Sequence, residues 1–192
     1  MQGVILGNFV QGMEVTDRGF TGGALDWANG FAMLTGFALV FGYALIGATW
    51  LIWKCEKETQ AWARRVANYV FVFVLLGMGL VSLCMPFIDE RIASLWFSTP
   101  NIFMLAPIPL LTLFAFFILW RDLHSTREIR PFLLTIAIFL LGYVGLGVSM
   151  FPWIVPFSFT IWDAAAVSTS HSILLVGTAV FLLIILAYSA YR

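Results

Sequence analysis

The stretch LTGFALVFGYALIGATWLIWK runs from Leu34 to Lys54 and carries no charge before its final lysine. A bilayer core about 30 Å thick requires roughly 20 apolar residues for one helical crossing, and this stretch meets that length. The strand of a transmembrane barrel would need only about 10 residues of alternating polarity, so the length of the run excludes a barrel. The stretch therefore predicts a membrane-spanning helix over residues 31–53.

Four more stretches of this kind follow along the chain. Of the 192 residues, 61% are hydrophobic and only 10% are charged, which is too apolar for a soluble domain of this length. Pro107 and Pro109 fall inside the third stretch, where they should kink the helix or delay its regular part. The sequence predicts an all-α integral membrane protein in which residues 1–192 form one transmembrane domain. Its five spans are expected at residues 31–53, 66–87, 101–120, 131–150 and 171–191.

Residues 1–30 precede the first expected span. Within them, Val4 to Val10 are apolar but too few to cross a bilayer. This short run fits either an interfacial segment or the tail of a helix whose beginning is absent.

Charge is distributed unevenly between the two expected sides of the membrane. Eight of the ten basic residues share one side: Lys54, Lys57, Arg64, Arg65, Arg121, Arg127, Arg130 and Arg192. Because loops rich in Lys and Arg stay in the cytoplasm, we expect the C-terminus inside and the N-terminus outside. The outer side then receives Glu14, Asp17, Arg18, Asp26, the sequence DER at 89–91 and Asp163. Topology accounts for the cations, so there is no basic patch of the kind that nucleic acid requires.

Two histidines are the candidates for a haem or metal ligand. His124 lies in the polar connection RDLHSTREIRP and is interpreted as a solvated loop residue. His171 opens the last span near the outer interface, and no second histidine on the preceding helices completes a bis-histidine pair. We predict no catalytic residue, no metal ligand and no cofactor in this chain. His171 is expected to be an interfacial polar residue, and a ligand role for it is the alternative.

Four segments carry a resemblance to a known family. They are, in order, GNFVQG at 7–12, the stretch at 34–54, MFPWIVP at 150–156 and TIWDAAA at 160–166. On these segments the chain resembles the C-terminal part of subunit II of the cytochrome bd quinol oxidase family, in its cyanide-insensitive branch. The resemblance covers essentially the whole chain. It implies a complex of the bacterial cytoplasmic (inner) membrane that oxidises quinol, reduces dioxygen to water and takes up cytoplasmic protons.

The resemblance also implies partners. In that family haems b and d belong to subunit I, and subunit II is a haem-free chain of two four-helix bundles plus a peripheral helix. Five spans correspond to one four-helix bundle plus one additional helix. The family's first half, with motifs of the DGFD and WDGNE kind, does not occur in this sequence, so we expect a fragment or truncated product with GVILGNFV as the stump of a preceding helix. Expected partners are the haem-bearing subunit I, membrane lipids and the quinone pool, with a structural quinone or lipid between the spans.

The loop FPWIVPFSFTIWDAAA, Phe151 to Ala166, places one carboxylate, Asp163, in a run otherwise uncharged from Pro131 to Tyr191. The structural interpretation is that Asp163 begins a helical turn as its N-cap and accepts hydrogen bonds from free backbone N–H groups. The functional interpretation is that Trp153 and Trp162 hold Asp163 at the outer interface, where it contacts subunit I, a quinone or a lipid head group.

Two other functions remain as alternatives. A small transporter subunit would need several charges within its spans, or broken helices in paired halves, and the cores of these five stretches contain no charge. A membrane assembly scaffold without a redox role would differ from the oxidase subunit only in whether it binds quinone.

Overall fold

The computed structural model describes residues 1–12, 15, 16, 19, 20, 23, 27–88, 90–156, 159–165 and 168–191. The backbone of His171 and Arg91 belongs to this part of the chain, but their side chains do not. Several residues named above lie outside the described residues: Glu14, Asp17, Arg18, Asp26, Asp89, Ala166 and Arg192.

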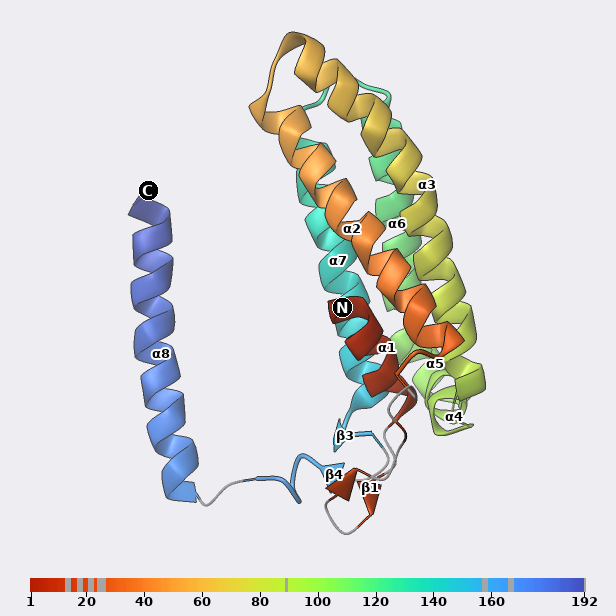
Figure 1. The fold of residues 1–192 in the computed structure, drawn as a ribbon, viewed down its shortest axis with the longest axis vertical. Coiled ribbons are helices and arrows are strands. Elements are labelled where there is room, and N and C mark those ends of the chain that lie inside the picture. Colours follow the sequence, from red (N-terminus) through yellow and green to blue (C-terminus); the bar gives the residue numbers. More distant parts are fainter. Residues whose placement is uncertain are drawn as a thin grey trace.

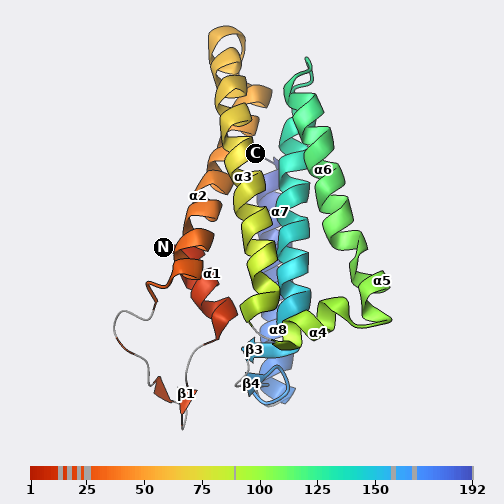
Figure 2. The same cartoon turned by 90° about the vertical axis from the view of Figure 1, so that its right-hand side faces the viewer.

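Four helices lie side by side as a bundle, as Figures 1 and 2 show. They are α2 (Gly30–Lys54), α3 (Lys57–Ile88), α6 (Pro107–Leu123) and α7 (Ile129–Met150). The connection between α2 and α3 lies at the same end of the bundle as the connection between α6 and α7 (Figures 1 and 2). We call this the basic end, formed by residues 54–65 and 121–130. The short strands lie at the opposite end, which we call the loop end.

A further helix, α8 (Ser168–Tyr191), stands apart from the bundle in Figure 1. All of its described large apolar side chains are exposed, from Ile173 at 70% to Tyr188 at 64%. Counting α8, five helices in the described part of the chain are long and apolar enough to cross a membrane. An all-α membrane protein with a four-helix bundle and one additional helix is therefore the architecture observed, while the side on which each terminus lies remains a prediction.

The helices differ from the expected spans chiefly in α3. It begins at Lys57, nine residues before the expected Val66, so the basic residues Arg64 and Arg65 lie on the helix and not in a loop. The sequence KETQAWARR contains neither Gly nor Pro and forms helix readily. Its first turns also bond to the α6–α7 connection, as Gln60 does to Glu128. The connection between α2 and α3 is correspondingly reduced to Cys55 and Glu56.

The third expected span is divided. Helix α5 (Asn101–Leu105) ends just before Pro107, and α6 begins there, with Pro107 in its first turn. Proline has no N–H to donate and clashes with the preceding turn, so it interrupts a helix or begins one. The expected delay of the regular part is thus observed. The residues between the second and third expected spans include the short helix α4 (Glu90–Phe97). Its Trp96 indole donates to Ser149 Oγ of α7 at 2.9 Å.

The core of the bundle is apolar, and small residues let its helices approach closely. Leu45, Ile52 and Leu119 are fully buried, and the central cluster includes several alanines and phenylalanines of α2, α3 and α6. Where α3 crosses α2, an added Cβ on Gly77 would lie 2.9 Å from Ala38 Cβ, closer than real Cβ atoms approach. Small residues therefore set the helix spacing, as is usual where lipid gives no hydrophobic drive for helices to associate.

The N-terminal segment is helical and packs on α2. Helix α1 (Gln2–Gln11) buries Gly3, Gly7 and Val10. Thr35 Oγ1 donates to the carbonyl of Gly3 at 2.8 Å, and Asn29 Nδ2, at the N-cap of α2, donates to Asn8 Oδ1 at 3.2 Å. The apolar run at 4–10 is therefore a helix held tightly against the bundle near its loop end (Figure 2). After it, β1 (Val15–Thr16) pairs with β2 (Gly19–Phe20) antiparallel.

Candidate functional site

The loop end contains the carboxylate that the sequence singled out. Strand β3 (Trp153–Val155) pairs antiparallel with β4 (Phe159–Thr160), and Trp153 lies opposite Thr160 in the register. Asp163 Oδ2 accepts from the Thr160 hydroxyl at 2.6 Å and from the Thr160 backbone N–H at 3.1 Å. Thr160 Oγ1 accepts from the Asp163 N–H at 3.3 Å. This reciprocal pattern is a capping box, in which two residues three apart satisfy each other's backbone donors.

The expectation that Asp163 is the N-cap is therefore wrong in its position. Thr160 begins the turn, whose backbone is closed by the Ala164 N–H bonding to the Thr160 carbonyl at 3.1 Å. Asp163 is the third residue after that cap and reaches back to it. The Thr160 hydroxyl, and then its backbone N–H, lower the pKa of Asp163 below its ordinary value of 3.8.

The other predicted site residues are distributed around this turn. Trp153 is half-buried in the hairpin and is joined to Asp163 through Thr160. Trp162 is 72% exposed and faces away from the protein interior. His171 lies in the first turn of α8, and its side chain is outside the described residues. The loop therefore brings Trp153 near Asp163 and leaves Trp162 on the surface.

The candidate metal ligands among the described residues do not gather in one place. No group of three or more His, Cys, Asp or Glu able to hold a metal ion occurs among them. His124 follows α6 as its C-cap, on the surface, and its Nδ1 lies 2.8 Å from the Trp120 carbonyl. A bis-histidine haem would need side chains facing each other inside the bundle, and the position of His124 does not fit that arrangement.

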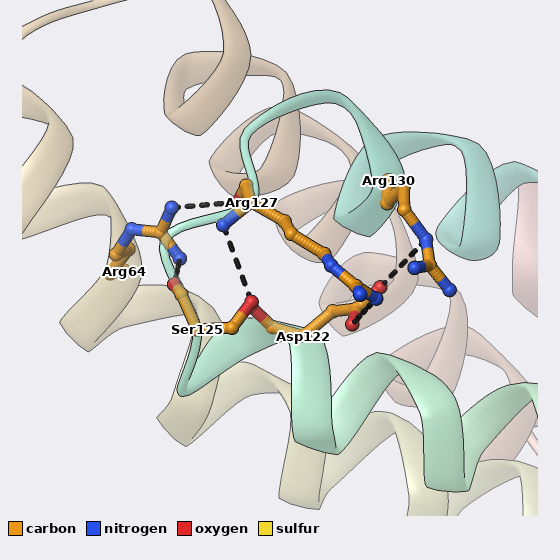
Figure 3. A network of polar contacts seen from close by, with 5 residues as sticks. All are labelled: Arg64, Asp122, Ser125, Arg127 and Arg130. Atoms are coloured by element: carbon orange, nitrogen blue, oxygen red, sulfur yellow. Dashed lines mark hydrogen bonds and ion pairs between the residues drawn. The ribbon is translucent and has the colours of Figure 1, made fainter.

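The basic end contains a polar network that the sequence did not single out (Figure 3). Asp122, at the end of α6, has a side chain only 1% exposed. Its Oδ1 accepts from Arg127 Nη1 at 2.9 Å, and its Oδ2 lies 3.2 Å from Arg130 Nε in an ion pair without hydrogen-bond geometry. Arg127 and Arg130 approach the carboxylate from opposite sides in Figure 3. Two guanidinium groups thus neutralise the buried carboxylate of Asp122. A buried carboxylate without such a partner would destabilise the fold.

Helix α3 fastens the same connection from outside. Arg64 Nη1 donates to the Ser125 carbonyl at 2.7 Å, and Nη2 donates to the Arg127 carbonyl at 2.7 Å. Gln60 Nε2 donates to Glu128 Oε1 at 3.0 Å and to the Ile52 carbonyl at 2.9 Å. One guanidinium therefore bonds to two carbonyls of the connection that follows α6. A carboxylate at the end of an apolar run, after Arg121 and with two more arginines five and eight residues later, is the signal that could have indicated this network.

Two apolar pockets lie near the loop end. The first has a volume of ≈ 350 Å³ between the start of α2 and the end of α3, and is lined by Gly30, Phe31, Leu34, Cys84, Phe87 and Ile88. The second, of ≈ 260 Å³, lies where α7 meets α5. Neither lining contains a charged residue, so both suit a hydrocarbon chain better than a polar substrate.

Comparisons with known proteins agree with this architecture. Among curated proteins no match was found. The family model described as cytochrome bd terminal oxidase subunit II matches residues 1–192, the whole of the chain. The multi-pass helical architecture and this match together identify the chain as a member of the cytochrome bd terminal oxidase subunit II family.

Proposed function

We propose that this chain is a haem-free subunit of a bd-type quinol oxidase and supports quinol oxidation and dioxygen reduction carried out in a partner subunit. The observation that carries the proposal is the family match along all 192 residues, which makes the chain a subunit of a terminal oxidase. The haems b and d, the quinol-oxidising site and the redox chemistry are assigned to subunit I. This chain's own contribution is to fold as a rigid neighbour for that subunit.

The distribution of ligand-type residues supports the haem-free assignment. Haem iron is held by His, Met or Cys side chains. His124 is on the surface at the basic end, and Met150 is packed with Val10 and Ile92 in an apolar cluster. Cys55 and Cys84 are free thiols that lie near opposite ends of the bundle. The two thiols are therefore too far apart to ligate one haem iron.

The exposed apolar surface supports assembly within a membrane. The core window of α8 is 0% buried within this chain, and its neighbours in the bilayer must be lipid or another protein. We propose that helix faces of this chain pack against subunit I, and that the N-terminus lies outside and the C-terminus in the cytoplasm of a bacterial inner membrane. The positive-inside rule supports that orientation, because the basic end carries Lys54, Lys57, Arg64, Arg65, Arg121, Arg127 and Arg130.

A structural quinone or lipid is the proposed occupant of the apolar pocket between α2 and α3. The pocket's volume of ≈ 350 Å³ is of the size that small-molecule sites have, and its lining suits an isoprenoid or acyl tail. Loss of the quinone pool should then leave the fold of the chain intact while lowering its thermal stability, since a ligand stabilises the state that binds it.

The test is purification of the tagged chain from membranes, with and without co-expression of a subunit I gene. We expect the chain to co-purify with a haem-bearing partner when both are expressed, and reduced-minus-oxidised spectra to assign all haem to that partner. Expressed alone, the chain should carry no haem and be poorly monodisperse in detergent. A monodisperse chain that itself binds haem would contradict the proposal, and extraction of complex without quinone or lipid in this subunit would remove the pocket's proposed occupant.

A further inference from the structure

Two tyrosines and a glutamine bring polar groups to the exposed side of α1, α2 and α7. Tyr43 Oη of α2 donates to Gln2 Oε1 of α1 at 2.9 Å, and both side chains are exposed. The Tyr43 ring stacks on Phe139 of α7, with the ring centroids 6.2 Å apart. Tyr143 follows Phe139 by about one helical turn and is 50% exposed. We call the surface formed by these four residues the tyrosine face.

The geometry of α7 supports the placement of Tyr143 on this face. Residues four apart in an α-helix differ by about 40° in direction, so Tyr143 points close to the side on which Phe139 meets α2. An added Cβ on Gly42 of α2 would collide with the same Phe139 ring. The side of α7 that faces the bundle interior is a different one, marked by the buried Thr135 and Ile138. Tyr143 therefore lies at the outer edge of the contact between α2 and α7.

The two tyrosine hydroxyls lie in the middle of the membrane. Tyr43 is 13 residues after the start of α2 at Gly30, and Tyr143 is 7 residues before the end of α7 at Met150. At 1.5 Å per residue, their Cα atoms lie about 20 Å and about 10 Å from the loop end. Helical side chains point back toward the N-terminus of their helix. This direction moves the Tyr43 hydroxyl toward the loop end and the Tyr143 hydroxyl away from it, so both come to about 15 Å, the centre of a hydrocarbon core about 30 Å thick.

Gln2 shares this depth through its bond to Tyr43. Figure 1 shows the start of α1 partway along the bundle and not at either end. Among the described residues, none accepts a hydrogen bond from Gln2 Nε2, and none bonds to the Tyr143 hydroxyl. A carboxamide has two N–H donors and a phenol has one O–H donor, and lipid chains can accept none of them. Leaving such groups unpaired in hydrocarbon is strongly unfavourable.

The exposed side of α6 provides a contrast. Its side chains Leu110, Leu113, Phe114 and Phe117 are 58–63% exposed, and all four are apolar, as lipid chains require. Polar side chains within a membrane face protein or a water-filled cavity instead. The polar groups therefore mark the tyrosine face as a surface that lipid does not cover.

We propose that the tyrosine face packs against a transmembrane helix of a partner polypeptide, which carries a hydrogen-bonding side chain (Ser, Thr, Asn or Gln) at the depth of Tyr143. That side chain bonds to the Tyr143 hydroxyl or to the Gln2 carboxamide, in the manner of polar side chains that join helices within membranes. This contact requires only that the bundle spans a membrane, so its absence would leave the proposed oxidase role untouched.

The test is photo-cross-linking of the whole complex in native membranes, with benzoylphenylalanine in place of Tyr143. We expect adducts with a second polypeptide, and peptide mapping should place them within one of its spanning helices. Benzoylphenylalanine in place of Phe114 is the matched control, because Phe114 is 60% exposed on the apolar side of α6 and should form adducts mainly with lipid.

Two results of the cross-linking would overturn the proposal. Adducts at position 143 only with lipid, with α8 or with a second copy of this chain would exclude the partner helix. Equal polypeptide adducts at positions 143 and 114 would show that the polar groups do not mark the contact.

Tyr143→Phe tests the hydrogen bond, because it removes the hydroxyl and keeps the ring. Association of the partner, measured by dissociation of the complex in increasing detergent, should weaken about threefold, the average effect of one interhelical hydrogen bond in a membrane. Tyr69→Phe on α3 is the control. Tyr69 is 74% exposed and lies four residues after Arg65, with its side chain directed toward the basic end, so water reaches its hydroxyl and association should not change.

Unchanged association in Tyr143→Phe, or an equal loss in Tyr69→Phe, would contradict the partner's hydrogen bond. Water is the remaining occupant to exclude. After replacement of Cys55 and Cys84, Tyr143→Cys should not react with an impermeant maleimide in sealed membranes. Rapid reaction would show that a water-filled cavity covers the tyrosine face, and would also overturn the proposal.

Discussion

Asp122 and Asp163 are both isolated carboxylates beside an apolar run, yet their environments are opposite. Asp122 has a side chain 1% exposed and is held by two arginines from the following turn and helix. Asp163 is exposed and is held by one threonine three residues before it. The first ties the end of α6 to the connection after it and to the start of α7, and the second is a cap within one turn. Substitution of Asp122 should therefore affect the α6–α7 connection, whereas substitution of Asp163 should affect only its own turn.

The hydrogen bonds that Asp163 accepts from Thr160 should weaken at acidic pH. Its pKa is lowered by Thr160 below the ordinary value of 3.8, so the folded turn favours the ionised form. The stabilisation is complete above the ordinary value and is lost as the pH falls through the lowered pKa. Hydrogen exchange of the peptide containing the Thr160 amide, corrected for intrinsic rates, should show protection lost over that range.

Asp163→Asn is the control for this titration. Its carboxamide oxygen can still accept from Thr160 but does not titrate, so its protection should not change over the same pH range. The same acid loss in Asp163→Asn and in the wild-type chain would show that the carboxylate is not responsible. Asp163→Leu should lose the protection at every pH, because leucine has no acceptor.

Removing the cations should harm the basic end more than removing the anion. Asp122→Asn leaves two half-exposed arginines that water can solvate, at a cost of about 1–2 kcal/mol in the free energy of unfolding. The double variant Arg127→Met with Arg130→Met leaves a buried carboxylate unpaired, at about 3–5 kcal/mol. Thermal denaturation of the purified complex shows which of the two variants is less stable. An Asp122→Asn variant as unstable as the double variant would mean that the carboxylate is not buried in the assembled protein.

Among the elements, α1 is held against α2 by close backbone packing. Gly3 and Gly7 lie four residues apart and face Ala32, Thr35 and Gly36 of α2. A Cβ on Gly3 would lie 2.6 Å from the Thr35 carbonyl oxygen. The absence of side chains lets the backbones meet and lets Thr35 bond to Gly3, the contact that small-xxx-small motifs allow. Helix α8 has no comparable contact among its described residues, which fits a helix whose neighbours lie outside this chain.

Gly7→Ala should loosen α1. Its Cβ would lie 2.6 Å from Ala32 Cα, and backbone atoms of two packed helices cannot yield, so we expect a cost of about 1–3 kcal/mol. Hydrogen exchange over residues 2–11 should rise, together with a lower unfolding temperature. Gly47→Ala on α2 is the control, because no heavy atom lies within 4 Å of its Cβ, and it should gain up to about 1 kcal/mol in helix propensity. Equal effects of the two substitutions would rule out the close contact.

At the scale of the molecule, the two ends of the bundle differ in chemistry. The basic end holds both short connections between long helices and the Asp122 network, whereas the loop end holds the strands, α4 and the Thr160–Asp163 turn (Figures 1 and 2). A chain inserted with the basic end in the cytoplasm keeps its arginines on the side where the positive-inside rule retains them. The alternation of the helices then places α4 at the outer surface.

This orientation can be checked by labelling single cysteines in sealed vesicles. After replacement of Cys55 and Cys84, cysteines at Lys57 and Thr126 should react with an impermeant maleimide only from the cytoplasmic face. A cysteine at Glu90 should react only from the outer face. All three positions are exposed within this chain. Labelling of positions 90 and 126 from the same face would contradict the bundle's orientation. A position that the partner subunit covers would become reactive after the complex is unfolded in denaturant.

The sequence by itself determined the features that depend on local composition. Span length, the break before Pro107 and the gathering of cations at one end follow from hydrophobicity and from the backbone limits of proline, which a single stretch of sequence contains. The start of α3 was predicted wrongly from the sequence. Polar residues extend this helix beyond the apolar run because the α6–α7 connection supplies hydrogen-bond partners for them. The error at Asp163 was smaller, since TIWD is a readable capping-box pattern whose first residue was overlooked.

Only the tertiary structure decided which residues meet. The burial of Asp122 depends on α7 bringing Arg130 to it and on Arg64 of α3 holding the connection. The importance of Gly7 depends on which face of α2 it meets. Such contacts combine helices separated by long stretches of sequence, and in a chain so rich in apolar residues many alternative pairings have similar hydrophobic energies. What distinguishes them is backbone approach and the neutralisation of charge, and both are fixed only when the helices are packed.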